Sequence, residues 1–107
     1  MDDRQIYVRD LLDAYRATPG TLGVARRADR DLAGRLFDRG VPLPVIRNAL
    51  LLATARRLVR SPSDPPLPAI RSLAYFRHVI DEVLAANLPD DYFHYLRETL
   101  RRLTPSR

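Results

Sequence analysis

"LFDRGVPLPVIRNALLLATARRL", residues 36–58, joins the end of one helical segment to a second, longer one through a short turn. Gly40 is placed to end the first helix, because glycine adopts the positive φ of a helix C-terminus without steric cost. Pro44 suits the first turn of the second helix, where its missing N–H needs no partner. The stretch therefore predicts two helices joined by a turn, as in a DNA-binding helix-turn-helix or an ordinary helical domain.

The second helix of this pair favours the ordinary packed arrangement. A helix-turn-helix protein exposes polar side chains in the N-terminal half of its second helix, where they contact base edges. That half offers Arg47 and Asn48, and the run ALLLA follows. A helix that is apolar on all sides is normally buried, in a core or at an oligomer interface. We therefore expect the helix at 43–60 to be central, with Leu50 and Ala53 almost fully buried.

Apolar residues recur every three or four positions along most of the chain, as on the buried face of a helix. Proline and glycine interrupt this pattern in the segments TPGTLG and SPSDPPLP, which we expect to be loops. No segment shows the alternation of a strand. The sequence predicts an all-α fold, a compact orthogonal bundle in one domain spanning 1–107, with helices at 3–17, 25–39, 43–60, 70–86 and 89–103.

The fourth and fifth predicted helices have broad apolar faces. We expect the fourth to bury Leu73, Phe76, Val79, Ile80, Val83 and Leu84. We expect the fifth to bury Tyr92, Phe93, Leu96, Leu100 and Leu103.

The charge of the chain favours an anionic partner, but a second origin for it is open. The sequence holds 18 basic and 13 acidic residues, which gives a formal net charge of +5. Such a balance favours nucleic acid as a partner. Every basic residue is arginine, however, and alanine, proline and leucine are frequent, which is typical of GC-rich coding. The charge can therefore reflect codon usage as well as binding.

Several classes of protein are disfavoured by composition. The chain has no cysteine, which excludes disulfide frameworks and thiolate metal sites. Its first residues, MDDRQIYVRD, lack the apolar region of a signal peptide. The longest apolar run is far shorter than the ~20 residues that span a bilayer. We therefore expect a bacterial-type cytoplasmic protein that does not enter a membrane.

No group of residues predicts catalysis. The four glycines are scattered, and none belongs to a phosphate-binding loop. Ser72 fits the N-cap of a helix at 70–86 better than a nucleophile. A metal site of His78, His94 and Glu82 is conceivable, but an ion pair between His78 and Glu82, one turn apart, is the simpler explanation. We expect no enzyme activity, no cofactor, no metal and no small-molecule substrate.

The arginines form three groups, near the start of the second predicted helix and near the ends of the third and fifth. These are Arg26, Arg27 and Arg30, then Arg56, Arg57 and Arg60, then Arg97, Arg101 and Arg102. Cations at helix C-termini complement the helix dipole, which explains the last two groups. Glu98 and Arg102 also form a favourable i,i+4 pair. Arg26 and Arg27 have no such explanation and carry more of the argument for phosphate contact.

Two patterns suggest a family. RGVPLPVIRNAL, residues 39–50, places Ile46 three residues before Ala49 in a helix after a glycine turn. SLAYFRHVIDEV, residues 72–83, follows the frame S-L-x-Y-I-x-x-I-L-x-x-W, with Val83 at the tryptophan position. Together they resemble the DnaD-like C-terminal helical domain of bacterial primosome proteins and phage replisome organisers. The likeness covers roughly residues 6–84.

The resemblance implies a helical module that contacts DNA, often single-stranded, and meets replication proteins. In the family, DNA contact is associated with the tyrosine-containing helix and the basic segment after it, which points to Tyr75 and Arg77 here. A fifth helix replaces the family's free basic tail.

Two functions follow from these observations. The first is weak binding of single- or double-stranded DNA without strong sequence preference, in replication or a mobile element. The second is a protein–protein interaction or homodimerisation module without nucleic-acid binding. The residues expected to bind nucleic acid are Arg26, Arg27, Arg30, Tyr75, Arg77, Arg97, Arg101 and Arg102.

Overall fold

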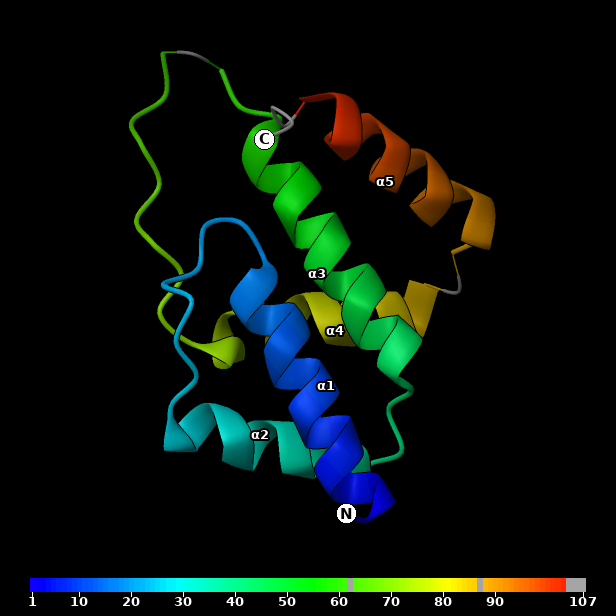
Figure 1. The fold of residues 1–107 in the computed structure, drawn as a ribbon. Helices are drawn as coiled ribbons and strands as arrows, with labels where there is room; N and C mark the ends of the chain where they lie inside the picture. Colours follow the sequence, from blue (N-terminus) through cyan, green and yellow to red (C-terminus); the bar gives the residue numbers. More distant parts are fainter. Residues whose placement is uncertain (62, 87, 104–107) are drawn as a thin grey trace.

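Helix α3, Leu43–Leu58, lies at the centre of the computed structural model, which describes residues 1–61, 63–86 and 88–103. It packs against α1 (Asp3–Ala17), α4 (Arg77–Ala86) and α5 (Asp90–Leu103). Figure 1 shows α1 and α3 running side by side, with α2 (Arg27–Asp38) crossing near the start of α1. The predicted all-α fold and the central third helix are confirmed.

The helix bounds agree with the sequence pattern except before α4. The first helix has the predicted bounds, and the second and third are shorter by two residues or fewer at each end. The predicted helical start at Ile70 is wrong. Ile70 donates its N–H to Gly20 O (2.7 Å) and accepts from Leu22 N–H (3.2 Å), in an isolated bridge between two loops. These backbone groups are therefore not free to start a helix, and the helical region begins with a short 3-10 turn, η1, at Leu73–Phe76.

The turn after α2 explains why Gly40 is needed. Its φ is +75°, as predicted. Its N–H donates to Phe37 O (2.9 Å), and the N–H of Val41 donates to Leu36 O (3.1 Å). These two bonds are those of the Schellman motif that satisfies the last carbonyls of a helix. Val41 is buried beyond the turn, and its carbonyl accepts from the Tyr7 hydroxyl at 2.8 Å.

The turn does not, however, produce a packed pair of helices. α2 packs mainly on α1 and η1, whereas α3 packs on α1, α4 and α5. Our expectation of a packed pair is wrong in this respect, because α1 and η1 cover the apolar side of α2. Burial of α3 within the core still argues against α3 as a helix that reads a major groove.

A buried carboxylate fixes the start of α2 against the start of η1. Asp29 is 2% exposed. Its Oδ2 accepts from the backbone N–H of Arg26 and its Oδ1 from that of Leu73, both at 2.9 Å. Ser72 precedes η1 as expected, but its side chain makes no cap bond. Asp29 supplies that cap from another helix and so satisfies N–H groups at two helical starts.

The core is one cluster to which every helix contributes. Tyr15 and Phe76 are fully buried and meet edge to face, with ring centroids 6.1 Å apart. The Tyr15 hydroxyl is buried without a hydrogen-bond partner in the described part of the chain, and burial raises its pKa. Leu50 and Ala53 are each 5% exposed, which confirms their predicted burial.

Two apolar positions that were predicted to be buried lie outside the core. The faces predicted for α4 and α5 included Leu84 and Tyr92, which are 42% and 38% exposed. Both faces are wider than the surface that α3 covers. Leu58, in the last turn of α3, is 46% exposed, and Figure 1 shows this end of α3 extending beyond α1 and α4. The expected burial of the Leu103 side chain lies outside the described residues.

Within the ranges described, no helix is long and apolar enough to cross a lipid bilayer.

Leu50→Ala should lower the free energy of unfolding by about 2–5 kcal/mol, because the buried side chain leaves a cavity. Leu58→Ala removes the same atoms from an exposed position of the same helix and should cost less than about 1 kcal/mol. Urea denaturation of both variants measures the difference. Equal losses would contradict the central position of α3.

Asp29→Ala should destabilise the fold by about 2–3 kcal/mol, because it removes two caps and leaves two N–H groups unpaired. Asp29→Asn keeps one acceptor oxygen, so its free energy of unfolding should lie between those of Asp29→Ala and the unmodified protein. Asp31→Ala is the control: it removes an exposed carboxylate from the same helix and should change stability by less than about 0.5 kcal/mol. The interpretation fails if urea denaturation shows that Asp29→Ala lowers the free energy of unfolding no more than Asp31→Ala does.

Candidate nucleic-acid interface

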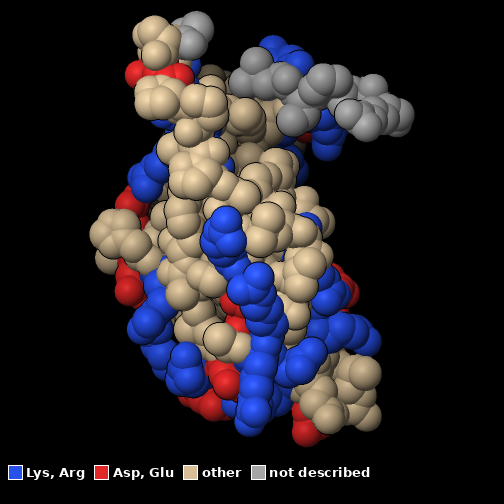
Figure 2. Space-filling view, turned by 90° about the vertical axis from the view of Figure 1, so that its left-hand side faces the viewer, with Lys and Arg blue, Asp and Glu red and all other residues tan. Residues whose placement is uncertain are grey.

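A groove of about 690 Å³ lies between α1 and α2. Five of its nine lining residues are arginine, namely Arg4, Arg9, Arg16, Arg30 and Arg35, and one is acidic, Asp31. We call it the arginine groove. Figure 2 shows one face of the molecule, on which basic side chains form a band at the height of α2 in Figure 1, with a few acidic side chains between them.

Arg4 lies across α2 at a glycine. A Cβ at Gly34 would collide with the Arg4 guanidinium, so a larger residue there would displace it. Arg4 Nε and Nη2 donate to the two carboxylate oxygens of Asp38, at 3.0 and 3.1 Å. This hydrogen bond lowers the pKa of Asp38 below its usual value. The contact ties α1 to α2 along the edge of the groove.

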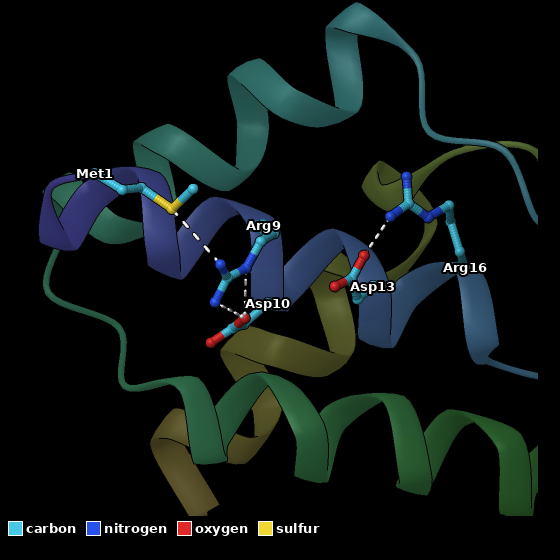
Figure 3. Close-up of polar contacts among 5 residues, drawn as sticks. All are labelled: Met1, Arg9, Asp10, Asp13 and Arg16. Atoms are coloured by element: carbon cyan, nitrogen blue, oxygen red, sulfur yellow. Dashed lines mark hydrogen bonds and ion pairs between the residues drawn. The ribbon is translucent and has the colours of Figure 1, made fainter.

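Arg9 and Arg16 have acidic partners on α1 itself (Figure 3). Arg9 donates to Asp10 Oδ1 from Nε and Nη2, both at 3.1 Å, and to Met1 Sδ at 3.6 Å. Arg16 pairs with Asp13, one turn earlier. The side chains of these pairs are between 33% and 57% exposed. Ion pairs this exposed contribute about 0–1 kcal/mol, so the guanidinium groups are held loosely.

Arg30 and Arg35 differ from the three arginines of α1. Both are exposed on α2 and line the groove. Neither forms an ion pair or a side-chain hydrogen bond with any residue in the described ranges. Their charge is therefore not neutralised by a bonded carboxylate, and their donors face water.

The other predicted arginines of α2 lie beside this groove. Arg26 and Arg27 are exposed at the start of the helix. Arg27 is one helical turn before Arg30, so their side chains are neighbours on the helix surface. The first arginine group of the sequence is thus continuous with the arginine groove.

Tyr75 and Arg77 lie elsewhere, at η1 and the start of α4. Tyr75 is 48% exposed. Its hydroxyl accepts from Arg57 Nη1 at 3.2 Å, and the Arg57 guanidinium carbon lies 5.8 Å from the ring centroid. Arg57 also donates to Pro68 O at 3.0 Å, so it links α3, η1 and the proline-rich loop. Arg77 is exposed.

The arginines of α5 occupy a third region. Arg97 and Arg101 line a groove of about 420 Å³ between α3 and α5, which we call the α3–α5 groove. Arg102 is exposed outside it. The predicted pair of Glu98 with Arg102 is wrong, because Glu98 pairs with Arg101 at 3.3 Å. The eight predicted residues therefore lie in several regions of the surface.

The histidines lie on the surface, and the predicted ion pair of His78 with Glu82 is wrong. Glu82 instead accepts from Arg56 of α3, with Nη1 to Oε1 at 3.0 Å. This bond lowers the pKa of Glu82, and the charge of His78 has a smaller effect in the same direction. His78 and His94 are exposed, and no three ligating side chains group together among the described residues.

Sequence reasoning identified Arg30 but missed the other four arginines of the groove. Arg9 and Arg16 are seven residues apart and so share one side of a helix, which was a usable signal. The sequence gave no such signal for Arg4 and Arg35, because their position at the groove depends on how α1 packs on α2.

Comparisons of the chain with protein-family models, with curated proteins and with solved structures gave no match. The likeness to the DnaD-like domain therefore rests on the two sequence patterns.

Arg56→Gln should raise the pKa of Glu82 toward that of a free glutamate, because it removes the hydrogen bond that favours the carboxylate. Carboxyl NMR titration measures this shift. Arg60→Gln, a change of the same charge one turn further along, should leave the pKa of Glu82 nearly unchanged. If the pKa of Glu82 does not change in Arg56→Gln, the hydrogen bond between Arg56 of α3 and Glu82 of α4 is absent in solution.

Proposed function

We propose that the chain binds nucleic acid weakly and without strong sequence preference, with the arginine groove as the centre of the interface. The observation that carries the proposal is the concentration of five arginines around one groove, two of them without an acidic partner in the described structure. Guanidinium groups bind phosphate oxygens bidentately, whatever base is attached.

Arg30 and Arg35 would make the first contacts, because no bonded carboxylate has to be displaced from them. Arg26 and Arg27 extend the same surface along the start of α2. The arginines of α1 can join when a phosphate replaces an aspartate, since exposed ion pairs of this kind are worth about 0–1 kcal/mol. The aspartates that remain nearby limit the net attraction and make the binding weak.

Weak sequence preference follows from the shape of the fold. Base reading in duplex DNA requires a helix or ribbon that presents side chains to base edges in a groove. Here α3, the helix that follows the glycine turn, is largely buried, and the groove offers arginines rather than a row of amide side chains. Contacts to the phosphate backbone would therefore dominate.

The remaining predicted residues would have secondary roles. Tyr75 is exposed enough to stack with a base, a contact worth ~1–3 kcal/mol where it forms, although Arg57 already contacts its ring. Arg77, Arg97, Arg101 and Arg102 would add charge from other faces. A role in replication or a mobile element, and a cytoplasmic location, belong to the same proposal. Their support is the likeness to the DnaD-like domain and the basic surface.

One observation favours the alternative, a module that binds protein or a second copy of itself. At the end of α3, Leu58 and Val59 are 46% and 80% exposed, and Leu67 in the following loop is 40% exposed. Leu58 and Leu67 line one shallow pocket, and exposed apolar side chains that lie together are a common feature of protein interfaces. This surface is distinct from the arginine groove, so the two functions do not exclude each other.

Fluorescence anisotropy with short single- and double-stranded DNA of several sequences tests nucleic-acid binding. If three or four phosphates are neutralised, log affinity should fall with log salt at a slope of about −2 to −4. Arg30→Ala with Arg35→Ala should weaken binding to all sequences alike and make the slope shallower by about 1–2. Arg26→Ala with Arg27→Ala should also weaken binding to all sequences and make the slope shallower.

The control is Arg39→Ala with Arg71→Ala, which removes the same charge from exposed positions that line neither groove. It should leave the slope almost unchanged. If the folded protein binds neither form of DNA at low salt, the proposal fails and the protein-interaction alternative takes its place.

A further inference from the structure

The α3–α5 groove has an apolar floor. Leu50 and Thr54 of α3 line it and are buried, and Leu51 beside them is half-buried. The Thr54 hydroxyl donates to Leu50 O at 2.7 Å, and the Thr18 hydroxyl at the edge of the groove donates to Ala14 O at 2.7 Å. Both hydroxyl groups therefore donate their protons to backbone carbonyls four residues earlier. The surface that the floor presents to a ligand is mainly hydrocarbon.

The rim of the same groove is basic. Arg47 of α3 and Arg97 and Arg101 of α5 line it, and none of the described residues that line it is acidic. Arg101 pairs with Glu98, whereas Arg47 and Arg97 have no ion pair or side-chain hydrogen bond with other residues of the described ranges. An apolar floor below unpaired cations is complementary to a ligand that is both apolar and acidic.

A polypeptide meets this requirement better than a nucleic acid. Among the residues that the structure describes, the lining includes no aromatic side chain on which a base could stack. A phosphodiester backbone carries no aliphatic group that could fill the floor. A peptide with leucine or phenylalanine beside aspartate or glutamate supplies both chemistries. The groove's volume of about 420 Å³ suits a few side chains rather than a whole domain.

We propose that the α3–α5 groove binds an acidic amphipathic segment of a partner protein, with an apolar side chain on the floor and carboxylates against Arg47 and Arg97. The inference does not depend on nucleic-acid binding at the arginine groove. If both hold, the chain connects a nucleic acid on one surface with an acidic protein segment on another.

The probe is a fluorescein-labelled peptide in which aspartate and glutamate alternate with leucine and phenylalanine. Two matched peptides accompany it, one with lysine in place of the acids and one with serine in place of the apolar residues. The first peptide should bind the full chain in an anisotropy titration, and each of the other two should bind about tenfold more weakly or not at all. Equal binding of the serine peptide would overturn the proposal, since charge alone would explain it.

Arg47→Glu with Arg97→Glu should lower the affinity for the acidic peptide by about tenfold or more, because carboxylates then face the ligand's carboxylates. The matched control is Arg30→Glu with Arg35→Glu, the same charge change in the arginine groove, which should keep the affinity within about twofold. If both double variants lower the peptide affinity equally, binding depends only on the net charge of the protein and the proposal fails.

Ala17→Phe tests the apolar half without changing any charge. Ala17 is exposed in the last turn of α1 and lines the groove, so a larger side chain should fill the groove while the fold stays intact. Peptide affinity should fall about fivefold or more if an apolar side chain occupies the floor. Urea denaturation checks folding of each variant.

Two further outcomes would also overturn the proposal. DNA binding that is lost in Arg47→Glu with Arg97→Glu, but kept in the arginine-groove control, would assign the groove to nucleic acid. Dimerisation of the chain alone that Ala17→Phe abolishes would assign it to a second copy.

Discussion

The Asp29 carboxylate is the contact on which the rest of the arrangement depends. It is buried, and its two oxygens accept backbone N–H groups from Arg26 and Leu73, which are far apart in the sequence. A buried carboxylate is costly unless its oxygens are hydrogen-bonded, so its two bonds hold the starts of α2 and η1 together. Arg30 directly follows Asp29, so this carboxylate fixes the start of the helix that carries Arg30 and Arg35, and the packing of α2 on α1 then forms the arginine groove. One core residue thus links stability to the proposed interface.

Local sequence signals predicted most of the fold because they act within a few residues. The glycine turn at Gly40 and the burial of Leu50 follow from backbone freedom and apolar periodicity, and both are confirmed. The start of the fourth helix was wrong because Ile70 pairs with a loop fifty residues earlier in the chain. The capping role of Asp29 was missed for the same reason. An aspartate near a helix start looks like an ordinary first-turn acid, and nothing local shows that a second N–H from Leu73 completes its bonding.

The proposed interface was less predictable than the fold. Arg30 was identified because it belongs to a cluster in the sequence, whereas Arg4 and Arg35 come together only through the packing of α1 on α2. The structure also shows how charge is distributed, which a net charge of +5 does not. Some arginines have acidic partners, such as Arg4 and Arg56, whereas Arg30, Arg35, Arg47 and Arg97 have none among the described residues. Unpaired arginines line both grooves, and the apolar floor of the α3–α5 groove is what suits it to an acidic amphipathic peptide rather than to phosphates alone.

The most direct test of the central claim is an NMR titration of the isotope-labelled full chain with a short single-stranded oligonucleotide at low salt. Arginine Nε–Hε signals report contacts of each guanidinium group, and backbone amides report the helices involved. The account predicts that the Arg30 and Arg35 side-chain signals shift first, together with amides of α1 and α2, and that raising the salt concentration reverses the shifts. Shifts confined to α4 and α5, or no shifts at all, would contradict it.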